Sequence, residues 1–164
     1  MIKVLFVCLG NICRSPMAEA VFRHQVKEAG LEAVISIDSA GTGDWHIGHP
    51  PHQGTRDILD AHEISYEGLQ ARQVRSDDFH QFTYIIAMDE SNVVNLASFA
   101  PELVGDTKHA AIHKLLEFSR NKPMTTDVPD PYYTGKFQEV YEMVVESCSR
   151  LLAFIVEKEK LVTE

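Results

Sequence analysis

The sequence predicts an α/β fold, a three-layer sandwich in which a central parallel sheet carries helices on both faces. Short apolar runs rich in β-branched residues alternate along the chain with segments of helical periodicity. Strands that alternate with helices are joined by right-handed crossovers, which produce parallel sheets. The length of 164 residues suits a single domain over residues 1–164 that can bury a core.

The first predicted strand covers residues 2–7, and a polar loop joins it to a helix with Pro16 in its first turn. Residues 33–38 are predicted to form a second strand. Residues 39–51 are predicted to form a loop, because they contain three glycines and a Pro-Pro pair. The apolar positions of the first helix keep helical spacing: Ala18, Val21, Phe22, Val26 and Ala29.

A short helix is predicted over residues 55–62, and Ser76 followed by two aspartates signals the start of another helix. Residues 83–88 form a clear buried strand in this prediction. Asp89 then caps a helix that continues through residues 93–97.

Residues 110–118 fit either a strand or a helix, and residues 121–133 are predicted to form a long loop containing prolines. The last helix has the strongest periodicity in the chain. Its apolar stripe consists of Phe137, Val140, Tyr141, Val144, Val145, Cys148, Leu151, Leu152, Ile155 and Val156.

The loop after the first strand carries a candidate nucleophile. It begins at Cys8 and reaches Arg14 six residues later, at the amino end of a helix. Unpaired N–H groups and the helix dipole favour an anion there, although the loop lacks the Walker A pattern. The plain alternative is a buried cysteine that ends a strand and an exposed arginine that starts a helix.

Each residue type in this loop has a chemical role to fill. N–H dipoles and the Arg14 guanidinium are expected to lower the pKa of Cys8, and the guanidinium fork fits two phosphoryl oxygens. Gly10 and Asn11 tolerate the left-handed backbone that turns N–H groups inward. Ser15 is a candidate donor to the Cys8 sulfur. A nucleophile inside an oxyanion cradle suits transfer of a phosphoryl group to sulfur.

The chain resembles the low-molecular-weight protein tyrosine phosphatases at several separate motifs, in the same order along nearly the whole chain. The matching segments are residues 7–19, Ser39-Ala40-Gly41-Thr42, Asp44-Trp45, Met88-Asp89-Glu90-Ser91-Asn92 and Asp130-Pro131-Tyr132-Tyr133. This resemblance implies a four-stranded parallel sheet, with its fourth strand in residues 110–118.

The resemblance also implies roles for particular residues. Asp130 is the expected general acid, although an Asp-Pro pair by itself is more typical of a plain turn. Trp45, Tyr132 and Tyr133 are expected to wall a cleft deep enough for phosphotyrosine and too deep for phosphoserine. Asp89 is expected both to cap a helix and to support the phosphate loop. Expected phosphate-binding and supporting residues are Leu9, Gly10, Asn11, Ile12, Cys13, Ser15 and Asp89.

Two further cysteines have different expected fates. Cys13 is either a small buried residue or a thiol that forms a disulfide with oxidised Cys8, and the resemblance favours the second role. Cys148 lies on the apolar stripe of the last helix and is predicted to be inert. His46, His49 and His52 match no common zinc spacing, so we expect exposed loop histidines, no metal and no cofactor.

Composition limits the partners. A net charge of −9 argues against a nucleic-acid or membrane-surface binder. Three cysteines do not suggest a secreted disulfide framework, and no apolar run is long enough for a signal peptide or a membrane span. We therefore expect a cytoplasmic protein, a monomer or one that self-associates weakly, which acts on phosphotyrosine proteins or small aryl phosphates and releases inorganic phosphate.

Alternatives to tyrosine phosphatase activity remain open at this point. An arsenate reductase of the same fold needs further accessible cysteines, whereas a phosphocysteine carrier lacks the arginine and the Asp-Pro acid. A phosphate-binding module without catalysis would not need Cys8, Arg14 and Asp130 together. Relatives of the arginine-phosphatase type have threonine at the position of Ile12 and lack the paired tyrosines, so tyrosine is favoured.

Overall fold

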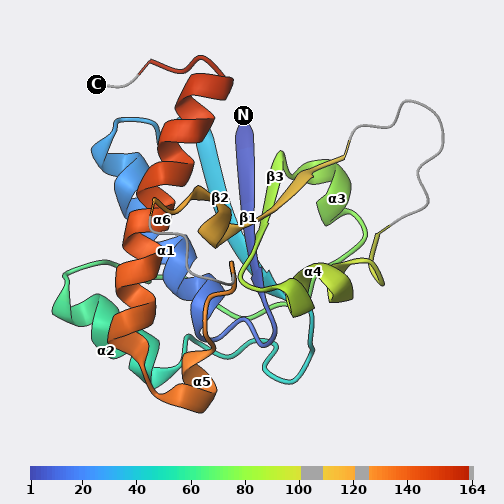
Figure 1. Ribbon diagram of the computed structural model, residues 1–164, viewed down its shortest axis with the longest axis vertical. Coiled ribbons are helices and arrows are strands. Elements are labelled where there is room, and N and C mark those ends of the chain that lie inside the picture. The colour runs from blue at the N-terminus through green and yellow to red at the C-terminus, as the bar shows by residue number, and fades with distance from the viewer. Residues whose placement is uncertain (101–108, 121–125, 163–164) are drawn as a thin grey trace.

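The computed structural model describes residues 1–100, 109–120 and 126–162, and its centre is a four-stranded parallel sheet (Figure 1). The strand order is β2-β1-β3-β4, with β1 paired to both β2 and β3. The predicted parallel sheet is therefore confirmed. Its strands are β1 (Ile2–Cys8), β2 (Ile35–Gly41), β3 (Tyr84–Ala87) and β4 (Ala111–Lys114).

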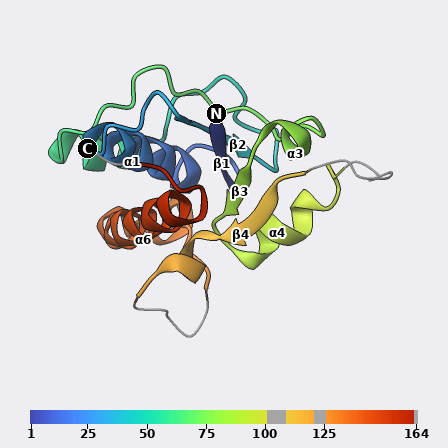
Figure 2. The ribbon, with the colours of Figure 1, turned by 90° about the horizontal axis from the view of Figure 1, so that it is seen from above.

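Helices cover both faces of the sheet, as predicted. The long helices α1 (Arg14–Glu28) and α6 (Phe137–Lys158) pack together on one face, with α2 (Gln53–Ala61) against both (Figure 2). The short helices α3 (Asp78–Gln81) and α4 (Glu90–Leu96) lie on the other face. The short helix α5 (Pro131–Thr134) immediately precedes α6.

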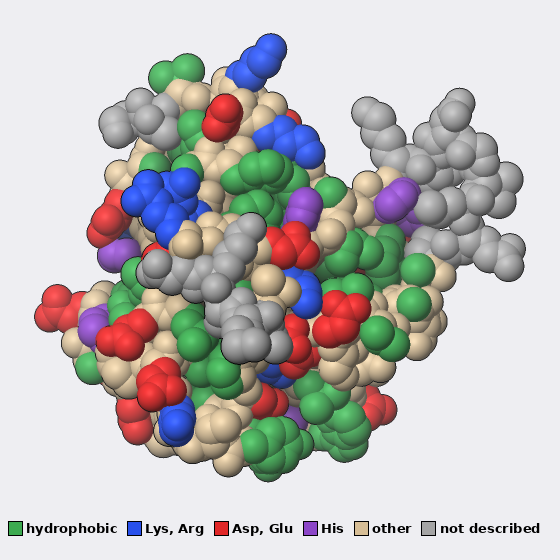
Figure 3. Space-filling model, in the orientation of Figure 1, with side chains coloured by type: hydrophobic (Ala, Val, Ile, Leu, Met, Phe, Trp, Pro, Cys, Tyr) green, Lys and Arg blue, Asp and Glu red, His purple; other side chains and the backbone are tan. Residues whose placement is uncertain are grey.

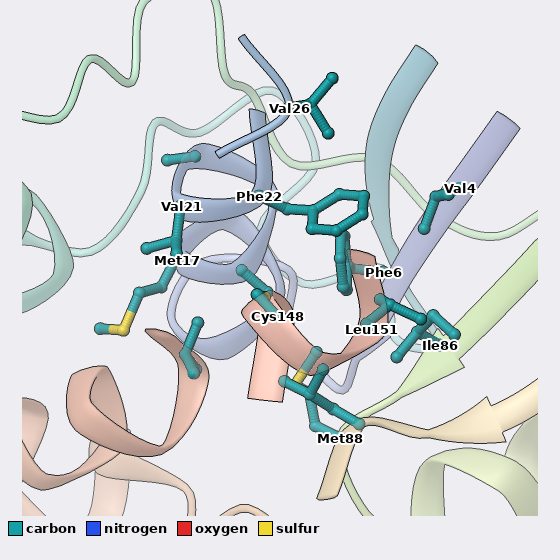
Figure 4. Close-up of a cluster of buried hydrophobic side chains, with 14 of the residues drawn as sticks. Val4, Phe6, Met17, Val21, Phe22, Val26, Ile86, Met88, Cys148 and Leu151 are labelled. Carbon is teal, nitrogen blue, oxygen red and sulfur yellow. The ribbon is translucent and has the colours of Figure 1, made fainter. Parts of the chain in front are cut away.

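Strand β1 divides the core in two, because successive side chains of a strand point to opposite faces. Val4 and Phe6 pack with residues of α1 and α6, where the rings of Phe6 and Phe22 meet edge to face 5.5 Å apart (Figure 4). Leu5 and Val7 pack with residues of α3 and α4 on the opposite face. Burial on both faces explains the nearly continuous apolar sequence of this strand.

Strand β2 is longer at its carboxyl end than predicted. The sequence prediction placed residues 39–41 in a loop, which is wrong, because pairing with β1 continues to Cys8 opposite Gly41. Its start is also later than predicted, at Ile35. The loop prediction failed because Gly41 is a paired strand residue here, and no turn occurs at it.

Several other boundaries differ from the predictions. Helix α2 begins at Gln53, two residues early, and α3 has only four residues. The ambiguous segment contains both β4, the fourth strand implied by the resemblance, and a 3₁₀ turn over Leu115–Phe118. Within the predicted loop over residues 121–133, residues 126–130 have no regular secondary structure and α5 follows, while residues 121–125 lie outside the described chain.

Among the described residues, no helix is both long enough and apolar enough to cross a membrane.

Candidate active site

The candidate site lies at the carboxyl end of the sheet, between the last residue of β1, Cys8, and the first residue of α1, Arg14. The neighbouring end of β2 holds this loop from the side. Thr42 donates its backbone N–H to the Cys8 carbonyl at 3.0 Å, and Gly43 donates to the Leu9 carbonyl at 2.9 Å. In such sheets, ligands bind where the strands end.

Two donors converge on the Cys8 sulfur. The Asn11 backbone N–H donates to Sγ over 3.3 Å, and the Ser15 hydroxyl oxygen lies 2.9 Å from it. The side-chain amide of Asn11 donates to Ser15 Oγ at 2.8 Å. Since that oxygen already accepts a hydrogen bond, its own hydrogen is available for donation to the sulfur. The sulfur is thus placed to accept hydrogen bonds from both Asn11 and Ser15.

The orientation of the Asn11 amide is fixed by three partners. Its Nδ2 donates to both Ser15 and Ser39, the latter at 2.9 Å, and its Oδ1 accepts the Arg72 backbone N–H at 3.0 Å. Asn11 is buried and has a left-handed φ of 56°, as its residue type predicted. These contacts hold the backbone N–H of Asn11 toward the sulfur.

Gly10 does not adopt the left-handed backbone that was predicted for it, since Asn11 is the loop residue with positive φ. The need for glycine there is steric. A Cβ atom on Gly10 would lie 3.1 Å from the imidazole of His46, which packs over the loop. Asn11 therefore supplies the left-handed turn of the loop, and Gly10 packs closely against His46.

Arg14 is buried and bridges the loop to two other segments. Its Nη1 donates to Asp89 Oδ2 at 2.6 Å and to the Val128 carbonyl at 2.9 Å, while Nη2 lies 3.5 Å from Asp130 Oδ2. Burial disfavours the charged guanidinium, but the Cys8 sulfur and the two carboxylates outweigh burial and raise the pKa of Arg14. The cation is therefore retained beside the sulfur.

The Asp89 carboxylate uses one oxygen for each of its two contacts. Oδ2 accepts from Arg14, whereas Oδ1 accepts the backbone N–H of Asn92 at 2.8 Å and so caps α4. Asn92 Oδ1 in turn accepts the Asp89 backbone N–H at 3.1 Å, which completes a capping box. The cap fixes the carboxylate that orients Arg14, although the side chain is only partly buried, with 21% exposed.

Asp130 is held over the same site by its own segment. It caps α5 by accepting the Tyr132 N–H at Oδ1 over 3.1 Å, with Pro131 at the first helical position. Two residues earlier, Val128 donates its N–H to the Met88 carbonyl at 2.8 Å, which ties the segment to the end of β3. The second carboxylate oxygen of Asp130 is left facing Arg14.

Cys8, Arg14 and Asp130 line one cleft with a volume of about 350 Å³, whereas Asn11, Ser15 and Asp89 lie outside its lining. Three aromatic side chains, Trp45, Tyr132 and Tyr133, are exposed and form its walls. Figure 3 shows hydrophobic side chains gathered along the lower edge of the molecule, the end at which α5 lies in Figure 1. The remaining lining residues are Cys8, Leu9, Gly10, Ile12, Cys13, Arg14, His46 and Asp130.

A buried carboxyl group that the sequence prediction gave no role lies behind the loop. Glu19 accepts the Ser39 hydroxyl at Oε1 over 2.6 Å and is 6% exposed. Burial raises the pKa of Glu19 to about 7, Asp38 adds to the rise, and Arg23 and Arg72 oppose it. A chain of hydrogen bonds thus runs from Cys8 through Ser15, Asn11 and Ser39 to the titratable carboxyl group of Glu19.

Glu19 and Ser39 both fell within the motifs that carried the family resemblance, so their place there was the available signal. Arg72 gave no such signal. Its role depends on a contact to Asn11 across a sequence separation of 61 residues. Two acids, Asp38 and Asp78, hold the Arg72 side chain at 3.1 and 3.0 Å.

Both remaining cysteines are buried thiols. Cys13 lines the cleft, and burial, together with the charges of Cys8 and Asp130, raises the pKa of its thiol to about 12. Cys148 is fully buried in the core under α6, where burial also raises its pKa. Cys13 therefore stays protonated beside Cys8, and Cys148 is remote from solvent.

The three loop histidines are not alike, which corrects the expectation that all are exposed. His49 is exposed, but His46 and His52 are half-buried. His46 lines the cleft, and His52 caps α2 by accepting the Gly54 N–H at Nδ1. Within the described ranges, no group of three potential ligand side chains is arranged to hold a metal ion.

Comparison with known proteins agrees with this geometry. Residues 3–161 match the family model described as low molecular weight phosphotyrosine protein phosphatase. The low molecular weight protein-tyrosine-phosphatase YfkJ of Bacillus subtilis is 51% identical over 98% of this chain and 100% of its own length. The low molecular weight protein-tyrosine-phosphatase PtpA of Staphylococcus aureus is 47% identical over 98% of both chains.

Solved structures agree as well. The crystal structure of YfkJ superposes with a TM-score of 0.88 and 52% identity, covering 98% of this chain and 97% of that one. The Drosophila arginine phosphatase DARP superposes with a TM-score of 0.84 and 36% identity, over 93% of this chain and 97% of that one.

Proposed function

The chain belongs to the low molecular weight phosphotyrosine protein phosphatase family, and we propose that it hydrolyses phosphotyrosine in proteins, and small aryl phosphates, through a phosphocysteine intermediate. The observation that carries this proposal is the convergence on one cleft of a sulfur with two donors, a buried guanidinium and a carboxyl group. Each of these groups has a distinct role in phosphoryl transfer.

In the first half-reaction, the Cys8 thiolate attacks phosphorus and forms the S–P bond while the P–O bond to the phenol breaks. Arg14 donates hydrogen bonds to the phosphoryl oxygens, and the loop N–H groups add further donors. Asp130, as the carboxylic acid, gives its proton to the leaving phenolate oxygen. Asp89 acts through Arg14 by fixing the guanidinium.

In the second half-reaction, water attacks the phosphocysteine. The Asp130 carboxylate takes a proton from that water, the S–P bond breaks, and the electron pair returns to the Cys8 sulfur as thiolate. Inorganic phosphate leaves, and Asp130 is again the acid needed for the next substrate. The Ser15 hydroxyl supports this step because it donates to the departing sulfur.

Tyrosine is the preferred substrate class because of the cleft walls. Trp45, Tyr132 and Tyr133 present ring surface at the mouth, and Cys8 is only 3% exposed within the cleft. A phosphotyrosine side chain spans that depth and stacks on the walls, whereas a phosphoserine side chain is too short. Phosphoarginine is the second candidate, since an arginine phosphatase shares the fold, but Ile12 and the tyrosine pair favour an aryl group.

The two cleft thiols also support redox protection of the nucleophile. Peroxide would oxidise the Cys8 thiolate to a sulfenic acid, which condenses with the Cys13 thiol to give a disulfide and water. Both sulfurs line the same cleft, and Cys13 is a protonated thiol. A thiol reductant then restores both, which suits a reducing compartment such as the cytoplasm.

A substrate panel tests the proposal. Purified protein is assayed with a phosphotyrosine peptide, a phosphoserine peptide, phosphoarginine and arsenate, and the variant Cys8→Ser serves as the matched control. We expect rapid release of phosphate from phosphotyrosine alone and none from the variant. Faster turnover of phosphoarginine, or reduction of arsenate, would replace this proposal.

A further inference from the structure

We propose that His52 is a positioning residue that holds Tyr132, one wall of the cleft, where the aromatic ring of the substrate packs. This inference rests on the proposed function, because the wall matters only for an aryl phosphate. His52 contacts Tyr132 from behind and is not among the residues that line the cleft.

The backbone and side chain of His52 are each fixed. Its N–H donates to the carbonyl of Ile12, in the phosphate loop, over 2.7 Å. Its Nδ1 accepts the Gly54 N–H over 3.0 Å and caps α2. This hydrogen bond fixes the orientation of the imidazole ring relative to the start of α2. His52 is therefore tied to the phosphate loop through its backbone and to the start of α2 through its side chain.

Behind His52 lies a second ring. Phe137 stacks on the imidazole with centroids 5.2 Å apart and planes inclined by 17°. Phe137 in turn packs against a buried cluster formed by Ile12 and Cys13 of the phosphate loop together with Ala71. Gly54 leaves room for this ring, since a Cβ atom there would lie 2.5 Å from it. Phe137 thus connects the His52 ring to buried residues of the phosphate loop.

Among the residues that the structure describes, two other rings lie near Tyr132. Its side chain is half exposed, and its ring meets His52 edge to face at 5.9 Å. Its other ring neighbours are Tyr133, which is more exposed than Tyr132, and His46 at 6.5 Å. The stack of Phe137 and His52 therefore transmits the position of the phosphate loop to the wall.

Two substitutions separate the functions of His52. His52→Asn keeps a side-chain cap for α2 but removes the ring, and His52→Phe keeps a ring but removes the cap. An edge-to-face aromatic pair contributes about 0.5–1.5 kcal/mol, so His52→Asn should raise the KM for a phosphotyrosine peptide about 2- to 10-fold. His52→Phe should leave that KM unchanged and lower the melting temperature by about 2–4 °C.

Competitive inhibition by inorganic phosphate distinguishes positioning of the wall from general damage to the site. Phosphate occupies the loop alone, so its inhibition constant should stay within about 2-fold of wild type in both variants. His49→Asn is the matched control, since His49 lies in the same loop, is exposed, and has its ring against His46. It should leave KM, phosphate inhibition and melting temperature unchanged.

An unchanged KM in His52→Asn would overturn the inference, as would a parallel rise in the phosphate inhibition constant. An equal rise in His52→Phe or in the His49→Asn control would also overturn it. Failure of the proposed function would look different, because wild-type protein would not hydrolyse phosphotyrosine. In that case, binding of phosphotyrosine to Cys8→Ser, with and without His52→Asn, still decides the role of His52 by calorimetry.

Discussion

Replacing Glu19 by glutamine should make the stability of the protein much less dependent on pH. The wild-type carboxyl is 6% exposed, accepts a hydrogen bond from Ser39, and has a pKa raised from 4.5 to about 7, chiefly by burial. Glutamine is close in shape, keeps an oxygen that can accept from Ser39, and is neutral at every pH. The substitution therefore isolates the effect of the buried charge.

The raised pKa of Glu19 determines how the stability of the protein changes with pH. Because the pKa of Glu19 is higher in the folded state, folding favours the protonated acid, and the associated stability is fully present below pH 4.5. It is lost as pH rises through about 7. At about 1.4 kcal/mol per pKa unit, the whole loss is about 3 kcal/mol. About 2 kcal/mol of it falls between pH 5 and pH 8.

Urea unfolding followed by circular dichroism at pH 5 and pH 8 gives the required free energies. The difference between Glu19→Gln and wild type should become more favourable to the variant by about 2 kcal/mol on going from pH 5 to pH 8. Glu157→Gln, at an exposed position near the end of α6, is the matched control. Its difference from wild type should be the same at both pH values.

A pH-independent difference for Glu19→Gln would refute this reasoning. It would mean that the folded protein solvates the Glu19 charge as well as water does, in conflict with the burial of the group. A variant that became less favourable as pH rose would show that ionised Glu19 is stabilised by Arg23 and Arg72 more strongly than burial disfavours it.

Three further substitutions test the catalytic arrangement. Asp130→Ala should lower kcat/KM by about 10²-fold or more for phenyl phosphate and much less for dinitrophenyl phosphate, whose leaving group needs no proton; equal losses would remove Asp130 from the acid role. Arg14→Lys should lower kcat/KM by about 10²- to 10³-fold, because an ammonium cannot hold Asp89 and bind two phosphoryl oxygens together; steady-state kinetics would expose a milder effect. Gly41→Ala would place a Cβ atom 2.8 Å from the Leu9 carbonyl oxygen. Inhibition by inorganic phosphate should therefore weaken, while circular dichroism shows that the protein stays folded. Unchanged inhibition would contradict the role of the end of β2 in holding the loop.

Much of the fold could be predicted from the sequence because its signals are local. The apolar stripe of α6 places Val140, Val144 and Leu151 in the core, and the Asp89 cap follows from residue type at a strand end. The carboxyl end of β2 was mispredicted because glycine composition alone cannot show that Gly41 pairs with Cys8. Pairing is a long-range property, which local patterns do not record.

In the candidate site too, local spacing predicted some residues, and long-range contacts brought in the others. Cys8, Arg14 and Ser15 lie close together in the sequence, at the two ends of one loop, so their proximity followed from sequence spacing. The groups behind that loop are brought together only by the register of β2 on β1, which aligns Phe6 with Ser39 and so places Ser39 near Asn11. The half-buried state of His52 likewise depends on contacts with Phe137, 85 residues away along the chain, so loop composition predicted it wrongly.

The most direct test of the account is to find where the phosphoryl group resides during turnover. Wild-type protein is mixed with a phosphotyrosine peptide, quenched in acid within milliseconds, and analysed by peptide mass spectrometry, with Cys8→Ser in parallel. The phosphocysteine mechanism predicts a transient phosphate on the peptide that contains Cys8 and none in the variant. Full turnover without that adduct, or a phosphate on any other residue, would contradict it.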